Sequence, residues 1–118
     1  MYKDKLKSFE TRNKKLLDIS DLPKLQEKLK KRSKKTVFTI GSFNLIHTGH
    51  CRYLAEAKAL GDVLIAGVTS DFSENLKGAE YPLISEEIRK EMLAFLKVVD
   101  YVVTVDEKNP YDVLLLLK

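Results

Sequence analysis

The chain has 118 residues, enough for one domain with a modest core, and its 44% hydrophobic and 32% charged residues exclude a disordered protein. No apolar run approaches the roughly 20 residues that cross a bilayer, and the lysine-rich start lacks the apolar stretch of a secretory signal, so we expect a cytoplasmic location without membrane contact. The single cysteine excludes an internal disulfide, and we expect Cys51 to pack on a helix.

Positive charge is concentrated at the start of the chain. Residues 1–35 carry 13 Lys and Arg against 5 Asp and Glu, whereas residues 36–118 carry 8 against 12. We predict a basic helical leader over residues 1–33, in which residues 1–18 form a mobile tail or an oligomerisation arm. The basic run lacks interleaved aromatic residues for base stacking, so we interpret it as a solvated helix face and do not expect nucleic acid as a partner.

The second half of this leader has the signals of an amphipathic helix. Ser20 or Asp21 can cap it, and Pro23 lies early in its first turn. One apolar stripe is formed by Leu22, Leu25 and Leu29.

A strand, a turn and a helix are predicted next. Residues 36–40 are β-branched and aromatic, as in a strand, and residues 51–60 are rich in Ala and Leu, as in a helix that stops at Gly61. Residues 41–50 between them read Gly-Ser-Phe-Asn-Leu-Ile-His-Thr-Gly-His and hold both histidines of the chain. The histidines therefore belong to the first strand-to-helix turn.

That turn has the properties of a phosphate site. The amino end of a helix offers unpaired N–H groups and a partial positive charge to an anion. We expect Gly41 to adopt a backbone conformation that bulkier residues resist, and Gly49 to let the main chain approach a ligand. His47 and His50 can add hydrogen-bond donors. None of these residues needs to act as a nucleophile, because in nucleotidyl transfer the protein mainly positions reactants and stabilises charge.

Two other interpretations of the histidines carry less weight. They could be solvated side chains, or they could bind a metal, although beyond Cys51 the chain has no further Cys or His to complete such a site. The spacing also departs from the Rossmann and P-loop glycine patterns, which removes two common explanations for nucleotide binding.

Strands and helices alternate through the rest of the chain. Residues 62–69 and 100–105 have the near-continuous apolar composition of buried parallel strands, and residues 109–117 open with the signals of a last helix. Ser85 can cap a helix between the two strands. This βαβαβα order predicts an α/β fold, a parallel sheet with flanking helices. The predicted buried stripe of the middle helix is Ile88, Met92, Leu93 and Leu96.

Three charged residues should lie near the phosphate turn, because the carboxyl ends of parallel strands share one edge of the sheet. Asp71 follows the second predicted strand and can approach a ligand or its Mg²⁺, or act as an ordinary loop or capping residue. Lys77 can bind phosphate as a point charge or remain solvated. Arg89 lies one turn into the next helix, where it can reach the same crevice or pair with Glu86.

These motifs, in this order, resemble the cytidylyltransferase-like nucleotidyltransferase family. The resemblance covers residues 34–118, and its most specific element is the H-x-G-H run. Within the family the chain is most similar to the adenylyltransferase domain that acts on heptose 1-phosphate, and next to glycerol 3-phosphate cytidylyltransferase. The further matches are Thr-Ser-Asp at 69–71, Leu-Lys-Gly at 76–78 and Val-Asp-Tyr-Val-Val at 99–103.

The resemblance implies a Rossmann-like sheet of the nucleotidyltransferase α/β-phosphodiesterase type. It also implies a reaction in which a phosphate monoester attacks the α-phosphorus of a nucleoside triphosphate, with Mg²⁺ present and pyrophosphate released. ATP and a sugar phosphate like heptose 1-phosphate are the expected substrates. CTP and glycerol 3-phosphate or a similar polyol phosphate are the alternative.

The resemblance also assigns roles by position. The implied catalytic residues are His47, His50 and Lys77, and the implied substrate-binding residues are Asp71, Lys77 and Arg89. No metal ligand is assigned. The implied nucleotide-binding residues are Gly41, Ser42, Phe43, Asn44, His47, Gly49 and His50.

The chain departs from the family pattern at two points. Asn44 stands where these enzymes usually have Asp, and the family continues through two further strands and a Ser/Thr-rich motif. We therefore expect the first strand at an exposed sheet edge, covered by another copy in a homo-oligomer or by a missing C-terminal segment. A non-catalytic nucleotide-binding module, or a truncated fragment, is the alternative function.

Overall fold

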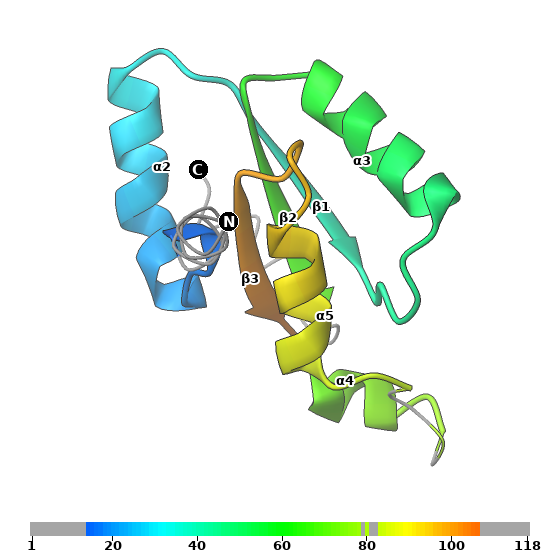
Figure 1. Ribbon diagram of the computed structural model, residues 1–118. Coiled ribbons are helices and arrows are strands. Elements are labelled where there is room, and N and C mark those ends of the chain that lie inside the picture. The colour runs from blue at the N-terminus through cyan, green and yellow to red at the C-terminus, as the bar shows by residue number, and fades with distance from the viewer. Residues whose placement is uncertain (1–13, 79, 81–82, 107–118) are drawn as a thin grey trace, which may run out of the picture.

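The computed structural model describes residues 14–78, 80 and 83–106, which form a parallel sheet between helices (Figure 1). The strands pair in parallel in the order β1-β2-β3, so β1 lies at an edge of the described sheet, as predicted. The predicted α/β fold with a Rossmann-like parallel sheet is confirmed. The elements are η1 (Ile19–Asp21), α2 (Leu22–Lys31), β1 (Thr36–Gly41), α3 (Thr48–Ala59), β2 (Val63–Thr69), α4 (Asp71–Asn75), α5 (Glu86–Ala94) and β3 (Tyr101–Val105).

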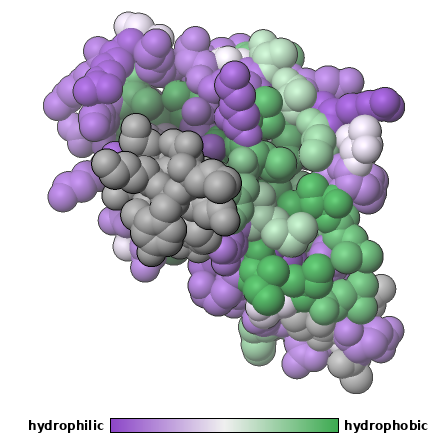
Figure 2. Space-filling view, viewed as in Figure 1, coloured by the Kyte–Doolittle hydropathy of each residue, from purple (hydrophilic) through white to green (hydrophobic). Residues whose placement is uncertain are grey.

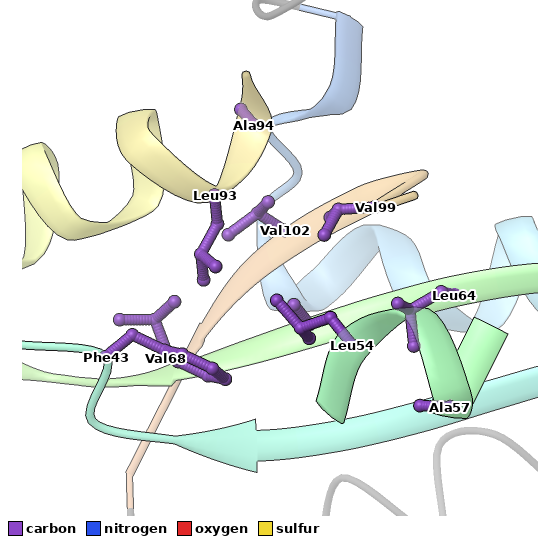
Figure 3. Packing of buried hydrophobic residues seen from close by; sticks show 10 residues of the cluster. Phe43, Leu54, Ala57, Leu64, Val68, Leu93, Ala94, Val99 and Val102 are labelled. Carbon is purple, nitrogen blue, oxygen red and sulfur yellow. The ribbon is translucent and has the colours of Figure 1, made fainter. Parts of the chain in front are cut away.

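One face of the sheet is covered by α3 and α5. Side chains alternate between the two faces of a strand, and β2 directs Leu64, Ala66 and Val68 toward these two helices. Figure 3 shows how closely the helix and strand side chains approach one another. The buried members of this cluster are Phe43, Leu54, Ala57, Leu64, Ala66, Val68, Leu93, Ala94, Val99 and Val102.

The opposite face is covered by α2 and η1. Leu22 is fully buried against Ile65, Val103 and Val105, and Leu25 packs at the margin of that cluster. The main chain just before η1 also contacts the sheet, since the N–H of Leu17 donates to the carbonyl of Val102 over 2.9 Å. The described part of the basic leader is therefore attached to the sheet.

The predicted stripe of α2 is confirmed, but its predicted cap is not. Leu22 and Leu29 are buried and Leu25 is half-buried. Asp21 occupies the N-cap position without a side-chain hydrogen bond, and the capping carboxylate is Asp18, which accepts from the N–H of Ser20 at the start of η1.

Two other boundaries differ from the prediction. Helix α3 begins at Thr48, three residues before the predicted start, because His47 acts as its cap. The short helix α4 follows β2 at a position where no helix is predicted. The helix predicted over residues 109–117 lies outside the described residues. Within the ranges that the structure describes, no helix combines the length and apolar character needed to cross a membrane.

The buried side of α5 is a correction to the predicted stripe. Ile88 is 52% exposed and Met92 37% exposed, whereas Arg89 is fully buried. Leu93 is buried and Leu96 partly buried, as predicted. The prediction merged two neighbouring stripes of equal helical spacing, and the helix buries the one that contains Arg89 because this side chain finds hydrogen-bond acceptors at the sheet edge.

The other stripe remains on the surface. In Figure 2 hydrophobic residues gather over α4 and α5. Large exposed hydrophobic residues of these two helices and their caps are Phe72, Leu76, Ile88, Met92 and Phe95.

Candidate active site

The turns that follow β1 and β2 meet at the carboxyl edge of the sheet. Gly41, the last residue of β1, pairs with Val68, and β2 ends one residue later at Thr69. Helix α4 begins at Asp71, and its Glu74 contacts Ser42 in the turn after β1. This is the edge at which open parallel sheets bind their ligands.

The two histidines form the first turn of α3. The Nδ1 atom of His47 accepts the N–H of Gly49 at 3.0 Å, and the Nδ1 atom of His50 accepts the N–H of His47 at 3.3 Å. The ring centroids lie 4.2 Å apart. Because each Nδ1 accepts a hydrogen bond, the neutral ring carries its proton on Nε2. Two imidazole N–H donors thus belong to one helix amino terminus, where the backbone already favours an anion.

The special backbone conformation predicted for Gly41 is not found. Neither Gly41 nor Gly49 has a positive φ; the left-handed conformation falls on Phe43, with φ of 52°. A Cβ on Gly41 would lie 2.8 Å from the Phe43 ring, and a Cβ on Gly49 would lie 2.7 Å from the His47 ring. The missing side chains therefore make room for two aromatic rings that shape the turn.

A buried carboxylate that the sequence analysis missed connects the two turns. Glu74 of α4 is fully buried. Its Oε2 atom accepts from the hydroxyls of Ser42 and Thr69 at 3.1 and 2.9 Å, and its Oε1 atom accepts from Asn44 Nδ2 at 3.0 Å. The only sequence signal was Lys77 three residues later, which forms an ion pair with it at 2.7 Å.

This carboxylate is ionised at neutral pH. Burial alone would raise the pKa of Glu74, but the hydrogen bonds from Lys77, Thr69, Asn44 and Ser42 outweigh it and lower the pKa from 4.5 to about 2. The ionised Glu74 carboxylate therefore places a fixed negative charge against the turn after β1.

Arg89 donates hydrogen bonds to the same two turns. Its Nη1 donates to the carbonyls of Ser42 and Thr69 at 2.9 and 2.7 Å, and its Nε donates to the carbonyl of Ile84 at 2.7 Å. Its Nη2 donates to Asp71 Oδ1 at 2.9 Å, so its ion-pair partner is Asp71 and not the Glu86 considered from the sequence. The guanidinium is fully buried and bonded to protein oxygens on three sides.

Asp71 also caps the helix that carries Arg89. Its Oδ1 accepts the N–H of Glu86 at 2.8 Å, while its own N–H donates to the Glu86 carboxylate at 3.3 Å. Ser85 occupies the N-cap position of α5 without a side-chain hydrogen bond, so the predicted cap is wrong and Asp71 supplies the acceptor. Of the two interpretations weighed for Asp71, the structure thus provides a capping contact.

The predicted site residues fall into two connected groups. Hydrogen bonds link Asp71, Arg89 and Lys77 to the turn at Ser42, where Lys77 Nζ donates to the Ser42 hydroxyl at 3.0 Å. His47 and His50 contact each other, and the His50 ring lies 5.6 Å from the Phe43 ring. The segment from Gly41 to His50 connects the two groups, because it contains Ser42 of the first and both histidines of the second.

The sequence from the first strand onward matches a known family. Residues 38–115, which include the turn, both histidines and the Glu74 cluster, match the family described as cytidylyltransferase-like. The chain belongs to the cytidylyltransferase-like family. The resemblance inferred from the motifs is thereby confirmed.

Relatives of this cytidylyltransferase-like chain share nearly half of their matched residues with it. The bifunctional protein HldE of Helicobacter pylori (strain G27) is 48% identical over 101 residues, which are 85% of this chain and 22% of that protein. HldE of Geobacter metallireducens is 46% identical over 105 residues, 88% of this chain and 21% of that protein. The chain thus spans about a fifth of the length of these relatives.

A solved structure has the same fold. The lipopolysaccharide core biosynthesis protein from Thermoplasma volcanium GSS1 superposes with a TM-score of 0.64 and 30% sequence identity, over 70% of this chain and 66% of that one.

The described part of this cytidylyltransferase-like chain contains no cluster of three or more His, Cys, Asp or Glu side chains that could hold a metal ion. The acidic side chains nearest the turn are Glu74, whose oxygens are occupied, and Asp71, which is 41% exposed. Mg²⁺ in nucleotide sites is commonly held by one or two carboxylates together with substrate phosphates and water. The residues present fit that kind of site, with Asp71 as the accessible carboxylate.

Proposed function

We propose that this chain is a nucleotidyltransferase that joins a nucleoside triphosphate to a phosphorylated sugar. A phosphate oxygen of the sugar phosphate forms a bond to the α-phosphorus, and the bond from the α-phosphorus to the bridging oxygen of the β-phosphate breaks. Pyrophosphate leaves with that electron pair. ATP is the proposed nucleotide and heptose 1-phosphate the proposed kind of acceptor.

The observation that carries this proposal is the pair of imidazole rings on the first turn of α3. Their Nδ1 atoms cap the helix, which fixes the rings and leaves His47 and His50 with Nε2–H donors. Donors held in advance stabilise negative charge that grows on the α-phosphoryl oxygens, and each such donor contributes about 3 to 4 kcal/mol to lowering a barrier. The helix amino terminus adds favourable potential for the same charge.

The other residues take supporting roles. The main-chain amides around Ser42 and Phe43 contact nucleotide phosphate, in a turn shaped by the Phe43 ring. Lys77, whose side chain is 37% exposed, provides a positive charge for a phosphate group. Arg89 is a positioning residue that fixes the carbonyl groups of both turns, because its guanidinium is buried among protein oxygens.

Mg²⁺ enters this proposal with the nucleotide. The ion would neutralise phosphate charge, with Asp71 as its protein carboxylate. The contacts of Asp71 with Arg89 and the N–H of Glu86 fix the position of that carboxylate.

Two findings support a sugar phosphate as acceptor. The motifs resemble most closely the domain that acts on heptose 1-phosphate, and a structural neighbour is a lipopolysaccharide core biosynthesis protein. CTP with glycerol 3-phosphate is the second pair, from the second resemblance.

The test is pyrophosphate release by the purified chain with Mg²⁺, using ATP or CTP in each combination with heptose 1-phosphate or glycerol 3-phosphate. His47→Ala and His50→Ala serve as site variants. Glu27→Gln, an exposed carboxylate of α2 on the opposite face of the sheet, serves as a control that should behave as the wild type. Nucleotide affinity is measured on the same samples by calorimetry.

We expect release with ATP and heptose 1-phosphate and its loss in both histidine variants. Release only with CTP and glycerol 3-phosphate would replace the proposed substrates. Nucleotide binding that depends on the histidines, without release from any pair, would identify a binding module. A chain that binds neither nucleotide would overturn the proposal.

A further inference from the structure

The oxygens of Glu74 are divided between two kinds of partner. Oε2 accepts from Ser42, Thr69 and Lys77, and Oε1 accepts from the amide of Asn44. These donors come from the turn after β1, the end of β2 and the segment after α4. One buried carboxylate therefore fixes three chain segments of the candidate site relative to one another.

As long as position 74 carries a carboxylate, the contact requires a hydrogen-bond donor at position 44. Asn44 Nδ2 lies 3.0 Å from Glu74 Oε1, and the Oδ1 atom of Asn44 is buried without a hydrogen-bond partner. A carboxylate at position 44 would place a second negative charge against an ionised, fully buried one. Two carboxylates at that distance cannot both ionise without a large electrostatic cost, so one would take up a proton or the turn would move.

The contact between Glu74 and Lys77 joins a buried side chain to a partly exposed one. The Glu74 side chain is 1% exposed and the Lys77 side chain 37% exposed, so the lysine is partly exposed while its partner is buried. Glu74 thus holds Lys77 against Ser42 at a partly exposed position, where a positive charge can attract a phosphate group.

We propose that Glu74 is a positioning residue of the nucleotide site, which sets the turn through Ser42 and Asn44 and holds Lys77 ready for phosphate. A hydrogen-bonded pair of one amide and one carboxylate at positions 44 and 74 is a condition of nucleotide affinity. This inference rests on the proposed function, and it deepens that function by assigning the residue that organises the phosphate-binding turn.

Exchange of the two groups tests the pairing. Asn44→Asp places two carboxylates together, whereas Asn44→Asp combined with Glu74→Gln reverses the donor and acceptor with no change in total charge. In the double variant the new amide nitrogen at position 74 faces the new carboxylate at position 44, and the amide oxygen faces Ser42, Thr69 and Lys77. Glu74→Gln alone is the matched single variant, and Glu27→Gln controls for loss of an exposed carboxylate.

The measurements are the dissociation constant of ATP with Mg²⁺, repeated with CTP, and the urea midpoint of each variant without nucleotide. We expect Asn44→Asp to weaken ATP binding by about tenfold or more and to lower the urea midpoint. The double variant should bind ATP within about threefold of wild type and recover the midpoint. If Asn44→Asp does not fold, a folded double variant that binds ATP supports the pairing.

Three results would overturn the inference in distinguishable ways. A double variant that is no better than Asn44→Asp in either measurement would show that the two residues are not paired. A recovered urea midpoint with ATP affinity still lost would reduce Glu74 to a purely structural residue. Wild-type chain that binds neither nucleotide would remove the proposed function, while the urea midpoints would still report whether the pair exists.

Discussion

The turn after β1 and the buried cluster of Glu74 and Arg89 lie at the same edge of the sheet, but their polar groups have different partners. His47 and His50 each cap α3 with one nitrogen and have a second that can donate to a ligand. Glu74 and Arg89 are fully buried, and their charges are directed at protein atoms. The comparison separates residues that would contact substrate from residues that hold those contacts in place.

Mutations in the two regions should also have different effects, one mainly on folding stability and the other mainly on turnover. Removal of one partner from a buried network leaves others without hydrogen bonds, which costs folding free energy. Removal of a partly exposed donor costs little stability but weakens the binding of a growing charge. Stability and turnover should therefore respond to different residues of this one edge.

The largest effect on stability is expected for Arg89→Met. The change leaves the carbonyls of Ser42, Thr69 and Ile84, and the Asp71 carboxylate, without their common donor. The free energy of unfolding, measured with urea, should fall by about 3 to 5 kcal/mol. Arg32→Met, at the exposed end of α2, should change it by less than about 0.5 kcal/mol. A loss below about 1 kcal/mol in Arg89→Met would mean that the buried guanidinium does not hold the two turns.

The largest effect on turnover is expected for His50→Ala. With the substrate pair that supports pyrophosphate release, kcat should fall about 10²- to 10³-fold, because one donor to the α-phosphoryl oxygens is lost. The free energy of unfolding should fall by no more than about 1 kcal/mol, because the variant loses the capping hydrogen bond from the N–H of His47. A variant that keeps kcat within about threefold of wild type would place the transition state elsewhere.

Acid should lower the free energy of unfolding of the wild type more than that of a variant without the Glu74 charge. The pKa of Glu74 is lowered to about 2 in the folded chain, so its ionised form adds stability above pH 4.5 that is lost as the pH falls toward about 2. That contribution is about 3 kcal/mol. The unfolding free energy of wild type should therefore fall more steeply than that of Glu74→Gln between about pH 5 and pH 2. Parallel curves would show that the carboxylate gains nothing from its donors.

The position of the two histidines in the first strand-to-helix turn was predicted from the sequence, whereas the buried cluster of Glu74 and Arg89 was not. Strand periodicity and the glycine-histidine turn were enough to place the sheet and His47 and His50, because these signals are local. Glu74 and the buried position of Arg89 depend on contacts between residues far apart in the chain, as in the bonds from the turn at Ser42. A charged residue on a short helix is normally solvated, so composition favoured exposure at both positions.

The same reason explains the stripe of α5. Ile88 and Met92 are more hydrophobic than Arg89, and helical periodicity fits either stripe equally well. The buried stripe includes Arg89 because acceptors for its guanidinium come from β2 and the turn after β1, which are distant in the sequence. Periodicity identified the helix but could not select its buried face.

The smallest change in stability is expected at His47, whose ring both caps a helix and belongs to the proposed phosphate site. Its Nδ1 atom caps α3, and its Nε2 atom is proposed to contact phosphate. Asparagine can keep the cap, since its side-chain oxygen accepts a hydrogen bond from the helix start, but it cannot supply the imidazole donor. His47→Ala should lose about 1 kcal/mol of unfolding free energy, and His47→Asn only a few tenths. Both should lose nucleotidyl transfer to the same extent. If His47→Asn instead retained turnover together with stability, the ring would serve only as a helix cap, and catalysis would have to rest on His50 and the main-chain amides of the turn.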